Sequence, residues 1–117
     1  MARFHRLEIY HLAIKILRET HRNLDRFRGH ASLRDQMKRA CISTVSNICE
    51  GSERGTDREF KQFLRIARAS NSELDGQWNI AVALGLAPAG RSRAILDSVD
   101  HLGRMLSRFI SRLDDSG

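Results

Sequence analysis

The chain has 117 residues, of which 41% are hydrophobic and one is proline, so it is long enough for one ordered domain with a modest core. Twenty Lys and Arg residues against fourteen Asp and Glu residues give a formal net charge of +6, which is typical of proteins that bind polyanions. No apolar run approaches the roughly 20 residues that span a bilayer, and the first residues lack a signal-peptide core, so we expect a cytoplasmic protein without a membrane segment.

The first predicted helix covers residues 4–27. Its apolar positions recur in steps of three and four, at Leu7, Tyr10, Ile14, Leu17 and Leu24. This spacing places them on one helix face. His21 continues the same series, so we interpret it as a core or interface imidazole. Gly29 is a typical residue just beyond a helix end.

The second predicted helix covers residues 32–50. Ser32 is expected to cap its start, and Gly51 is expected to end it. Apolar residues again follow steps of three and four, at Leu33, Met37, Cys41, Thr44 and Ile48. Cys41 and Cys49 lie about 12 Å apart along such a helix, too far for a disulfide, so we expect two reduced thiols in the core.

The third predicted helix covers residues 57–84. Thr56 and Glu59 form a capping-box pattern, in which the two residues satisfy backbone N–H groups at the helix start. The apolar seam runs through Phe60, Leu64, Ala67, Asn71, Leu74, Trp78 and Ala81. Gly85 and Pro88 then predict a helix end.

The fourth predicted helix covers residues 91–113. Its seam lies at Ile95, Val99, Leu102, Leu106, Phe109 and Leu113. Short connections make neighbouring helices antiparallel. The sequence therefore predicts an all-α fold, an up-down-up-down antiparallel four-helix bundle, as a single domain over residues 1–117.

No motif for a catalytic, cofactor or metal site is present. The sequence has no phosphate-binding loop, dinucleotide fingerprint or hydrolase elbow. None of the five histidines follows a Glu by three residues, as in bundle di-metal sites, and Cys-x-x-Cys is absent. We predict a protein that is not an enzyme and has no cofactor and no metal.

A polar stripe follows the second predicted helix. It consists of Gln36, Arg39, Ser43, Asn47 (or Ser46) and Glu50. Two interpretations stay open: an ordinary solvated face, or a subunit interface in which each polar group finds a partner. Beyond Gly51, we expect Asn47, Glu50 and Arg54 to bond across the corner between the second and third helices, and we add Arg54 to the candidate interface.

Cationic rows follow the other predicted helices. The candidate phosphate contacts are Lys15, Arg18 and Arg22, then Arg58, Lys61, Arg65 and Arg68, then Arg104 and Arg108. Such rows fit phosphates along a nucleic-acid backbone, or they form a solvated face with weak ion pairs. Because Tyr10 and Trp78 both lie on seams, we expect no ring to be available for base stacking, and therefore little sequence specificity.

The segment "LRDQMKRACISTVSNICEGSERGTDREFKQFLRIARASNSELD", Leu33–Asp75, resembles bacterial four-helix-bundle proteins encoded in intervening sequences of large-subunit ribosomal RNA genes. The family pattern is matched by Gln36, Arg39, Ala40, Ser43, Asn47, Ile48, Glu50, Gly51 and Arg54, and by Glu59, Phe60, Phe63, Leu64, Ile66, Ala67, Ser70, Glu73 and Leu74. Thr44 and Cys49 depart from it, where Ile and Ala are usual.

The resemblance implies a cytosolic homopentamer with no catalytic residues. A related branch, the accessory proteins of diversity-generating retroelements, forms basic pentameric barrels that bind a reverse transcriptase and nucleic acid. Charge and resemblance together predict a non-enzymatic homo-oligomer that binds RNA or DNA through phosphate contacts. The alternative is an adaptor that engages an acidic protein partner, such as a reverse transcriptase.

Overall fold

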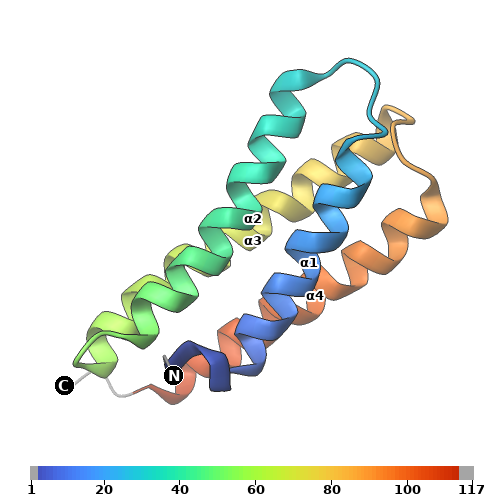
Figure 1. Cartoon of the computed structure of the whole chain (residues 1–117). Helices are drawn as coiled ribbons and strands as arrows, with labels where there is room; N and C mark the ends of the chain where they lie inside the picture. Colours follow the sequence, from blue (N-terminus) through green and yellow to red (C-terminus); the bar gives the residue numbers. More distant parts are fainter. Residues whose placement is uncertain (1–2, 114–117) are drawn as a thin grey trace.

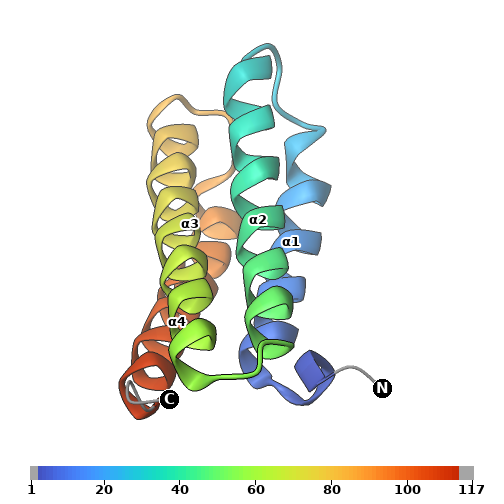
Figure 2. The ribbon, with the colours of Figure 1, turned by 90° about the vertical axis from the view of Figure 1, so that its left-hand side faces the viewer.

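The computed structural model describes residues 3–113. In that part of the chain, the helices are η1 (Arg3–Arg6, a 3-10 helix), α1 (Glu8–Leu24), α2 (Ala31–Ser52), α3 (Asp57–Ala83) and α4 (Ala89–Arg112), and there is no strand. They form an elongated bundle of 47 × 22 × 21 Å (Figure 1). α1 and α3 each pack against α2 and α4 and lie diagonal to one another (Figure 2). The predicted four-helix bundle is confirmed.

In the structure, the region predicted as one helix over residues 4–27 contains two helices, η1 and α1, and the second ends before residue 27. Leu7 has extended backbone angles, φ −93° and ψ 127°, and separates η1 from α1. At the other end α1 stops at Leu24, and the turn that follows buries Phe27. The Phe27 ring meets the Trp78 ring edge-on, with centroids 6.1 Å apart. Spacing along a single helix does not reveal this contact between separate parts of the chain.

α2 begins at Ala31, and the predicted cap at Ser32 is wrong. Gly29 and His30 both have positive φ, 71° and 56°, and this left-handed pair turns the chain into α2. The Arg34 guanidinium donates a hydrogen bond to the Phe27 carbonyl at 2.9 Å. Backbone conformation and this side-chain bond therefore hold the connection in place of a serine cap.

Gly51 does not stop α2, which continues to Ser52. A Cβ atom at Gly51 would lie 2.7 Å from the Phe63 Cβ and 2.9 Å from a ring carbon of Phe60. Distances this short do not occur between unbonded carbon atoms, so α2 and α3 approach closely only because residue 51 has no side chain. The predicted role of Gly51 as a stop is wrong, and its role is packing.

Thr56 caps α3 as predicted, but Glu59 does not complete the predicted capping box. The Glu59 backbone N–H donates to the Thr56 hydroxyl oxygen at 3.1 Å. The Thr56 hydroxyl in turn donates to the Glu59 carboxylate at 3.2 Å. The carboxylate thus meets the hydroxyl of Thr56, whereas a standard capping box has it accept from the backbone N–H.

The end of α3 follows the predicted glycine signal. Gly85 has φ 72°, and its N–H donates to the Val82 carbonyl at 3.0 Å. The Leu86 N–H donates to the Ala81 carbonyl at 2.9 Å. This pair of bonds is the Schellman motif, which satisfies carbonyls that the last turn would leave open. α3 ends at Ala83, one residue before the predicted boundary.

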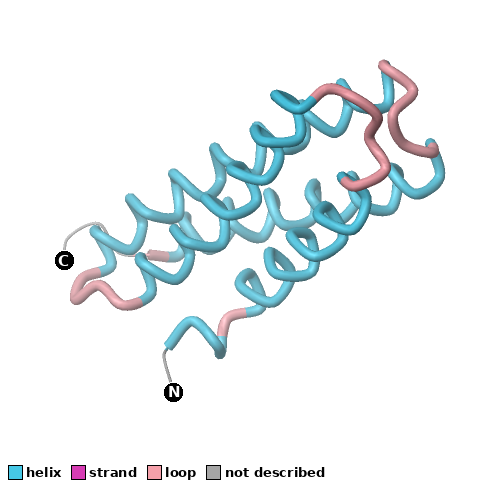
Figure 3. Tube along the Cα trace, turned by 45° about the horizontal axis from the view of Figure 1, so that its top comes forward, coloured by secondary structure: helices cyan, strands magenta, loops and turns pink. Residues whose placement is uncertain are grey.

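The connections lie at the two ends of the bundle (Figure 3). The α2–α3 connection shares one end with η1 and the last turn of α4, while the α1–α2 and α3–α4 connections share the other (Figure 1). α4 begins at Ala89, directly after Pro88, and so starts two residues before the predicted range 91–113. A fixed φ of −60° at Pro88 suits the entry to a helix.

Two hydrogen bonds between buried polar side chains and another helix cross the core. The Trp78 indole, fully buried, donates to the Thr20 hydroxyl at 3.3 Å and so joins α3 to the diagonal helix α1. The buried Asn71 amide donates to the Val99 carbonyl at 2.9 Å and joins α3 to α4. Such bonds fix the rotation of each helix, because a buried donor without a partner costs about 1–3 kcal/mol.

Candidate nucleic-acid interface

The predicted polar stripe of α2 is partly satisfied within the subunit. The Ser43 hydroxyl lies 2.7 Å from the Ser70 hydroxyl of α3. The Asn47 amide donates to the Ser43 carbonyl at 2.8 Å, one turn back on α2. Gln36 and Arg39 are exposed, and the Gln36 amide reaches only Ser32 of its own helix, at 3.2 Å. The stripe therefore borders α3 at its centre and faces outward toward the start of α2.

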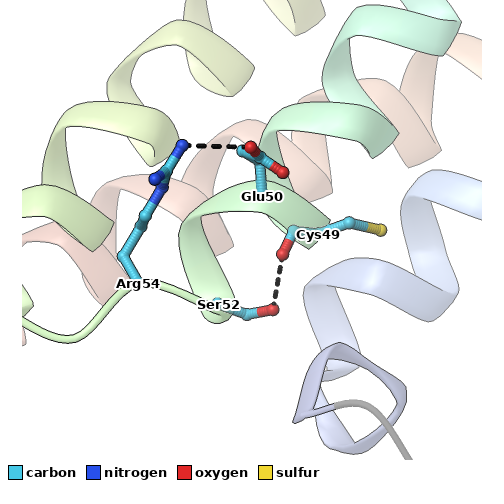
Figure 4. Close-up of polar contacts among 4 residues, drawn as sticks. All are labelled: Cys49, Glu50, Ser52 and Arg54. Carbon is cyan, nitrogen blue, oxygen red and sulfur yellow. Dashed lines mark hydrogen bonds and ion pairs between the residues drawn. The ribbon is translucent and has the colours of Figure 1, made fainter.

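The corner after α2 contains two of the three expected residues. Arg54 pairs with Glu50 at 3.0 Å (Figure 4), and its guanidinium lies 4.8 Å from the centre of the Phe63 ring. Asn47 does not take part, because its amide bonds one turn back, so this part of the prediction is wrong. The Ser52 hydroxyl donates to the Cys49 carbonyl at 2.8 Å (Figure 4). The ion pair is well exposed and contributes little stability.

Large hydrophobic side chains are exposed beside this stripe. Ile42 of α2 and Ile66 and Ile80 of α3 are each 50% exposed, and Leu84 just beyond α3 is 52% exposed. The Ser43–Ser70 contact fixes the alignment of the two antiparallel helices, so Asn47 and Ile66, one turn further, lie at about the same level. These residues were missed from the sequence, although their positions off the seams were a usable signal.

The cationic row of α1 is exposed and lines two adjoining grooves. The first, of about 390 Å³, is lined by Tyr10, His11, Ile14, Lys15, Arg18, Glu19 and Arg22. The second, of about 330 Å³, lies between α1 and α4 and is lined by Glu19, Arg22, Asn23, Arg26, Arg91, Ala94 and Ile95. Both grooves include Glu19 and Arg22.

We call the five cations of these two grooves the α1 track: Lys15, Arg18, Arg22, Arg26 and Arg91. Glu19 is the one acidic side chain that lines them. Arg26 and Arg91 were not among the predicted residues. Arg91 lies in the first turn of α4, and only the packing of α4 against α1 brings it near Arg22.

A third groove, of about 540 Å³, lies between α3 and α4 and brings together three predicted residues, Arg68, Arg104 and Arg108. The charge of these cations is partly neutralised by acids in the same groove. Arg104 pairs with Asp100 four residues earlier, and Asp75 also lines the groove. The Arg68 guanidinium is 3.4 Å from the Ser107 hydroxyl. Three cations against two acids make this groove a weaker site for a polyanion than the α1 track.

The remaining predicted cations do not join these grooves. Arg58 and Arg65 are exposed on α3 but line none of the three. Lys61 is 7% exposed, so its prediction as an open phosphate contact is wrong for the single subunit. The reason is that α3 is buried on two sides, by α2 and α4, and position 61 directly follows the buried Phe60.

Trp78 and Tyr10, the two aromatic residues that we placed on seams, differ in how deeply they are buried. Trp78 is fully buried, as expected. Tyr10 packs against the core, as its seam position predicts, but it is partly exposed and lines the first groove of the α1 track. Tyr10 is therefore less enclosed than Trp78.

Neither cysteine thiol is activated as a nucleophile. Burial raises the pKa of the Cys41 thiol to about 11, and burial together with the nearby Glu53 and Glu50 raises the pKa of Cys49, so neither is a thiolate at neutral pH. Both thiols are free. The His21 ring nitrogen Nδ1 is 3.0 Å from the Leu17 carbonyl of its own helix. Within residues 3–113, no group of three His, Cys, Asp or Glu side chains is placed to hold a metal ion.

A membrane-spanning helix is also absent from the described part of the chain, where none of the helices is both long and apolar enough to cross a bilayer.

The fold is shared with a solved structure. A protein of unknown function from the S23 ribosomal protein family of Bacteroides thetaiotaomicron superposes with a TM-score of 0.80, covering 87% of this chain and 97% of its own length. The two sequences are 13% identical, so this likeness concerns the fold alone. A comparison of the sequence with curated proteins found no match.

The family resemblance is confirmed over most of the sequence. The family model described as "23S rRNA-intervening sequence protein" matches residues 5–108. This range includes all four helices except the last turn of α4. The chain belongs to the 23S rRNA-intervening sequence protein family.

Proposed function

We propose that this protein is a non-enzymatic oligomeric bundle that binds RNA or DNA by phosphate contacts along the α1 track. The observation that carries the proposal is the charge of the track: five cations line two adjoining grooves with one acid, Glu19. Cations without nearby acids attract phosphates most strongly, because their field is not neutralised within the protein. Four of the five are Arg, whose guanidinium binds phosphate oxygens in pairs.

The length of the track also suits a nucleic-acid backbone. Lys15, Arg18, Arg22 and Arg26 follow steps of three and four residues, which keep them on one side of the first helix and the turn beyond it. From Lys15 to Arg26 the rise is about 16 Å at helical geometry. Phosphates along one strand of a duplex are spaced by about 3.4 Å along its axis, so the track can contact several of them.

The salt dependence of RNA binding tests the proposal. Each phosphate contact on a single strand contributes about −0.7 to the slope of log affinity against log salt concentration. Replacing Arg18 and Arg22 with glutamine should therefore reduce the magnitude of the slope by about 1.4. The measurement is fluorescence anisotropy of a labelled poly-uridine oligomer over a series of salt concentrations.

The matched control is the double variant Arg104→Gln, Arg108→Gln, which removes the same charge from the α3–α4 groove. We expect its slope to stay close to that of the wild type. A larger effect of the α4 pair than of the α1 pair would move the binding site to the α3–α4 groove. Absence of RNA binding by the wild type at physiological salt would favour the alternative, an adaptor that binds an acidic protein such as a reverse transcriptase, as implied by the likeness to retroelement accessory proteins.

We further propose that copies associate through the α2–α3 face. The exposed Ile42 and Ile66 lie there, beside the polar stripe of Gln36, Arg39, Ser43, Asn47, Glu50 and Arg54. Half-exposed isoleucines next to small polar side chains are typical of a surface that becomes buried against another chain. Five copies, the number that the family resemblance implies, would carry a formal charge of about +30 from +6 each.

Native mass spectrometry tests this association. The double variant Ile42→Glu, Ile66→Glu should shift the protein to the mass of one subunit, because two carboxylates cannot be buried at the contact without partners. Ala94→Glu with Ser111→Glu adds the same charge at exposed positions of α4 and should keep the wild-type mass. Equal masses for both double variants would place the contact elsewhere.

A further inference from the structure

Tyr10 lies at the end of the α1 track where the cations begin. Its ring is half-buried and meets the Phe4 ring of η1 with centroids 4.9 Å apart. The exposed His11 ring stands edge-on to it at 5.2 Å. The Phe4 and His11 rings therefore restrict the orientation of Tyr10, and Tyr10 also lines the groove. A ring fixed in this way has little conformational entropy to lose when a ligand stacks on it.

The groove combines this aromatic end with a cationic end. Its lining passes along α1 from Tyr10 and His11 through Ile14 to Lys15, Arg18 and Arg22. Helical geometry puts Lys15 about 7.5 Å and Arg18 about 12 Å along the axis from Tyr10. The volume of about 390 Å³ is at the lower end of the range for small-ligand sites. A planar uncharged group fits one end, and negative charges fit the other.

We propose that this groove holds one unpaired nucleobase against Tyr10 while Lys15 and Arg18 contact the neighbouring phosphates. The inference rests on the proposed function and adds to it a preference for single strands. In a duplex both faces of each base are covered by its neighbours, so the ring is not offered a face on which to stack. In a single strand the base can turn outward, and aromatic stacking then accepts every base with little regard to sequence.

A single substitution at Tyr10 separates the contribution of base stacking from that of the phosphate contacts. Tyr10→Leu keeps an apolar side chain of moderate size and removes the stacking surface. It should weaken binding of a poly-uridine oligomer about tenfold and leave binding of a duplex RNA of equal length within twofold. Tyr10→Phe keeps the ring and should bind both as the wild type does. Lys15→Gln should weaken both to a similar degree, because phosphates are present in each.

The measurements are fluorescence anisotropy for affinity and quenching of a fluorescent adenine analogue placed within the oligomer for stacking. Circular dichroism melting confirms that Tyr10→Leu is folded, and Tyr10→Trp, with a larger ring, provides a second variant that should retain quenching. Unchanged single-strand binding by folded Tyr10→Leu, or an equal loss for single strand and duplex, would overturn the inference while leaving the proposed function intact. A poly-glutamate peptide that bound as tightly as the single-stranded RNA would also overturn the inference, because a polyanion without bases has nothing to stack on Tyr10. Failure of the wild type to bind either RNA would instead contradict the proposed function itself.

Discussion

Replacing Trp78 with alanine should lower the free energy of unfolding by about 3–5 kcal/mol, the range for large aromatic residues in protein cores. Trp78 is fully buried and lies toward the end of the bundle at which α1 turns into α2. Its loss removes the hydrogen bond to Thr20 and the edge-on contact with Phe27. A domain of this size has about 5–15 kcal/mol of stability in total, so the substitution should remove a large share of it.

Urea denaturation followed by far-ultraviolet circular dichroism measures this effect. All variants are compared at one protein concentration, because the proposed association between copies would add to apparent stability. Trp78→Phe retains a ring against Phe27, so its free energy of unfolding should fall clearly less than that of Trp78→Ala. A stability within about 1 kcal/mol of the wild type for Trp78→Ala would contradict this prediction and would show that the surrounding core collapses into the cavity.

Two glycine-to-alanine substitutions should change the free energy of unfolding in opposite directions. At Gly51 the added Cβ would lie 2.7 Å from the Phe63 Cβ, which cannot move without its backbone, so α2 and α3 must separate. Overpacking of this kind costs about 1–3 kcal/mol, partly offset by the higher helix propensity of alanine. We expect a net loss of about 1–2 kcal/mol. Because the shift occurs on the α2–α3 face, association between copies should also weaken.

Gly76 is the matched control. It lies within α3, is exposed, and a Cβ there would meet nothing within 4 Å. Gly76→Ala should therefore raise the free energy of unfolding by about 0.5–1 kcal/mol, since alanine restricts the unfolded chain and favours the helix. Differential scanning calorimetry of both variants checks the signs. A stabilised Gly51→Ala protein would mean that α2 and α3 adapt to the added methyl group without cost.

Local signals in the sequence predicted the helices and two of their ends well. The cap at Thr56 and the stop at Gly85 depend on residues within one turn, so both can be recognised without knowledge of the fold. Gly51 could not be understood in this way. A glycine near a helix end has the same appearance whether it stops the helix or admits a neighbour, and only the position of Phe63 on α3 decides between them.

The part of the candidate site that lies on a single helix was predictable, because it depends only on local sequence spacing. The exposed row of Lys15, Arg18 and Arg22 lies on one helix, and spacing alone identifies it. Arg91 joins the row from α4 through tertiary packing, and Lys61 leaves its own row because two helices cover α3. Tyr10 belongs to a seam by spacing and packs against the core, yet part of it stays exposed in the subunit. The position of a residue on a helix predicts the side to which its side chain points, whereas the neighbouring helices decide whether that side chain is exposed.

The α1 track and the exposed isoleucines lie on different helices of the bundle, α1 with the start of α4 against α2 with α3. If copies join through their isoleucines as proposed, the tracks would stay on helices outside that contact. A long strand that dissociated from one subunit would then stay close to the next, so rebinding would occur at a high effective concentration and total avidity would exceed that of one site by a factor of about 10²–10⁴. Strand length, more than base sequence, would then determine which transcripts such a particle retains.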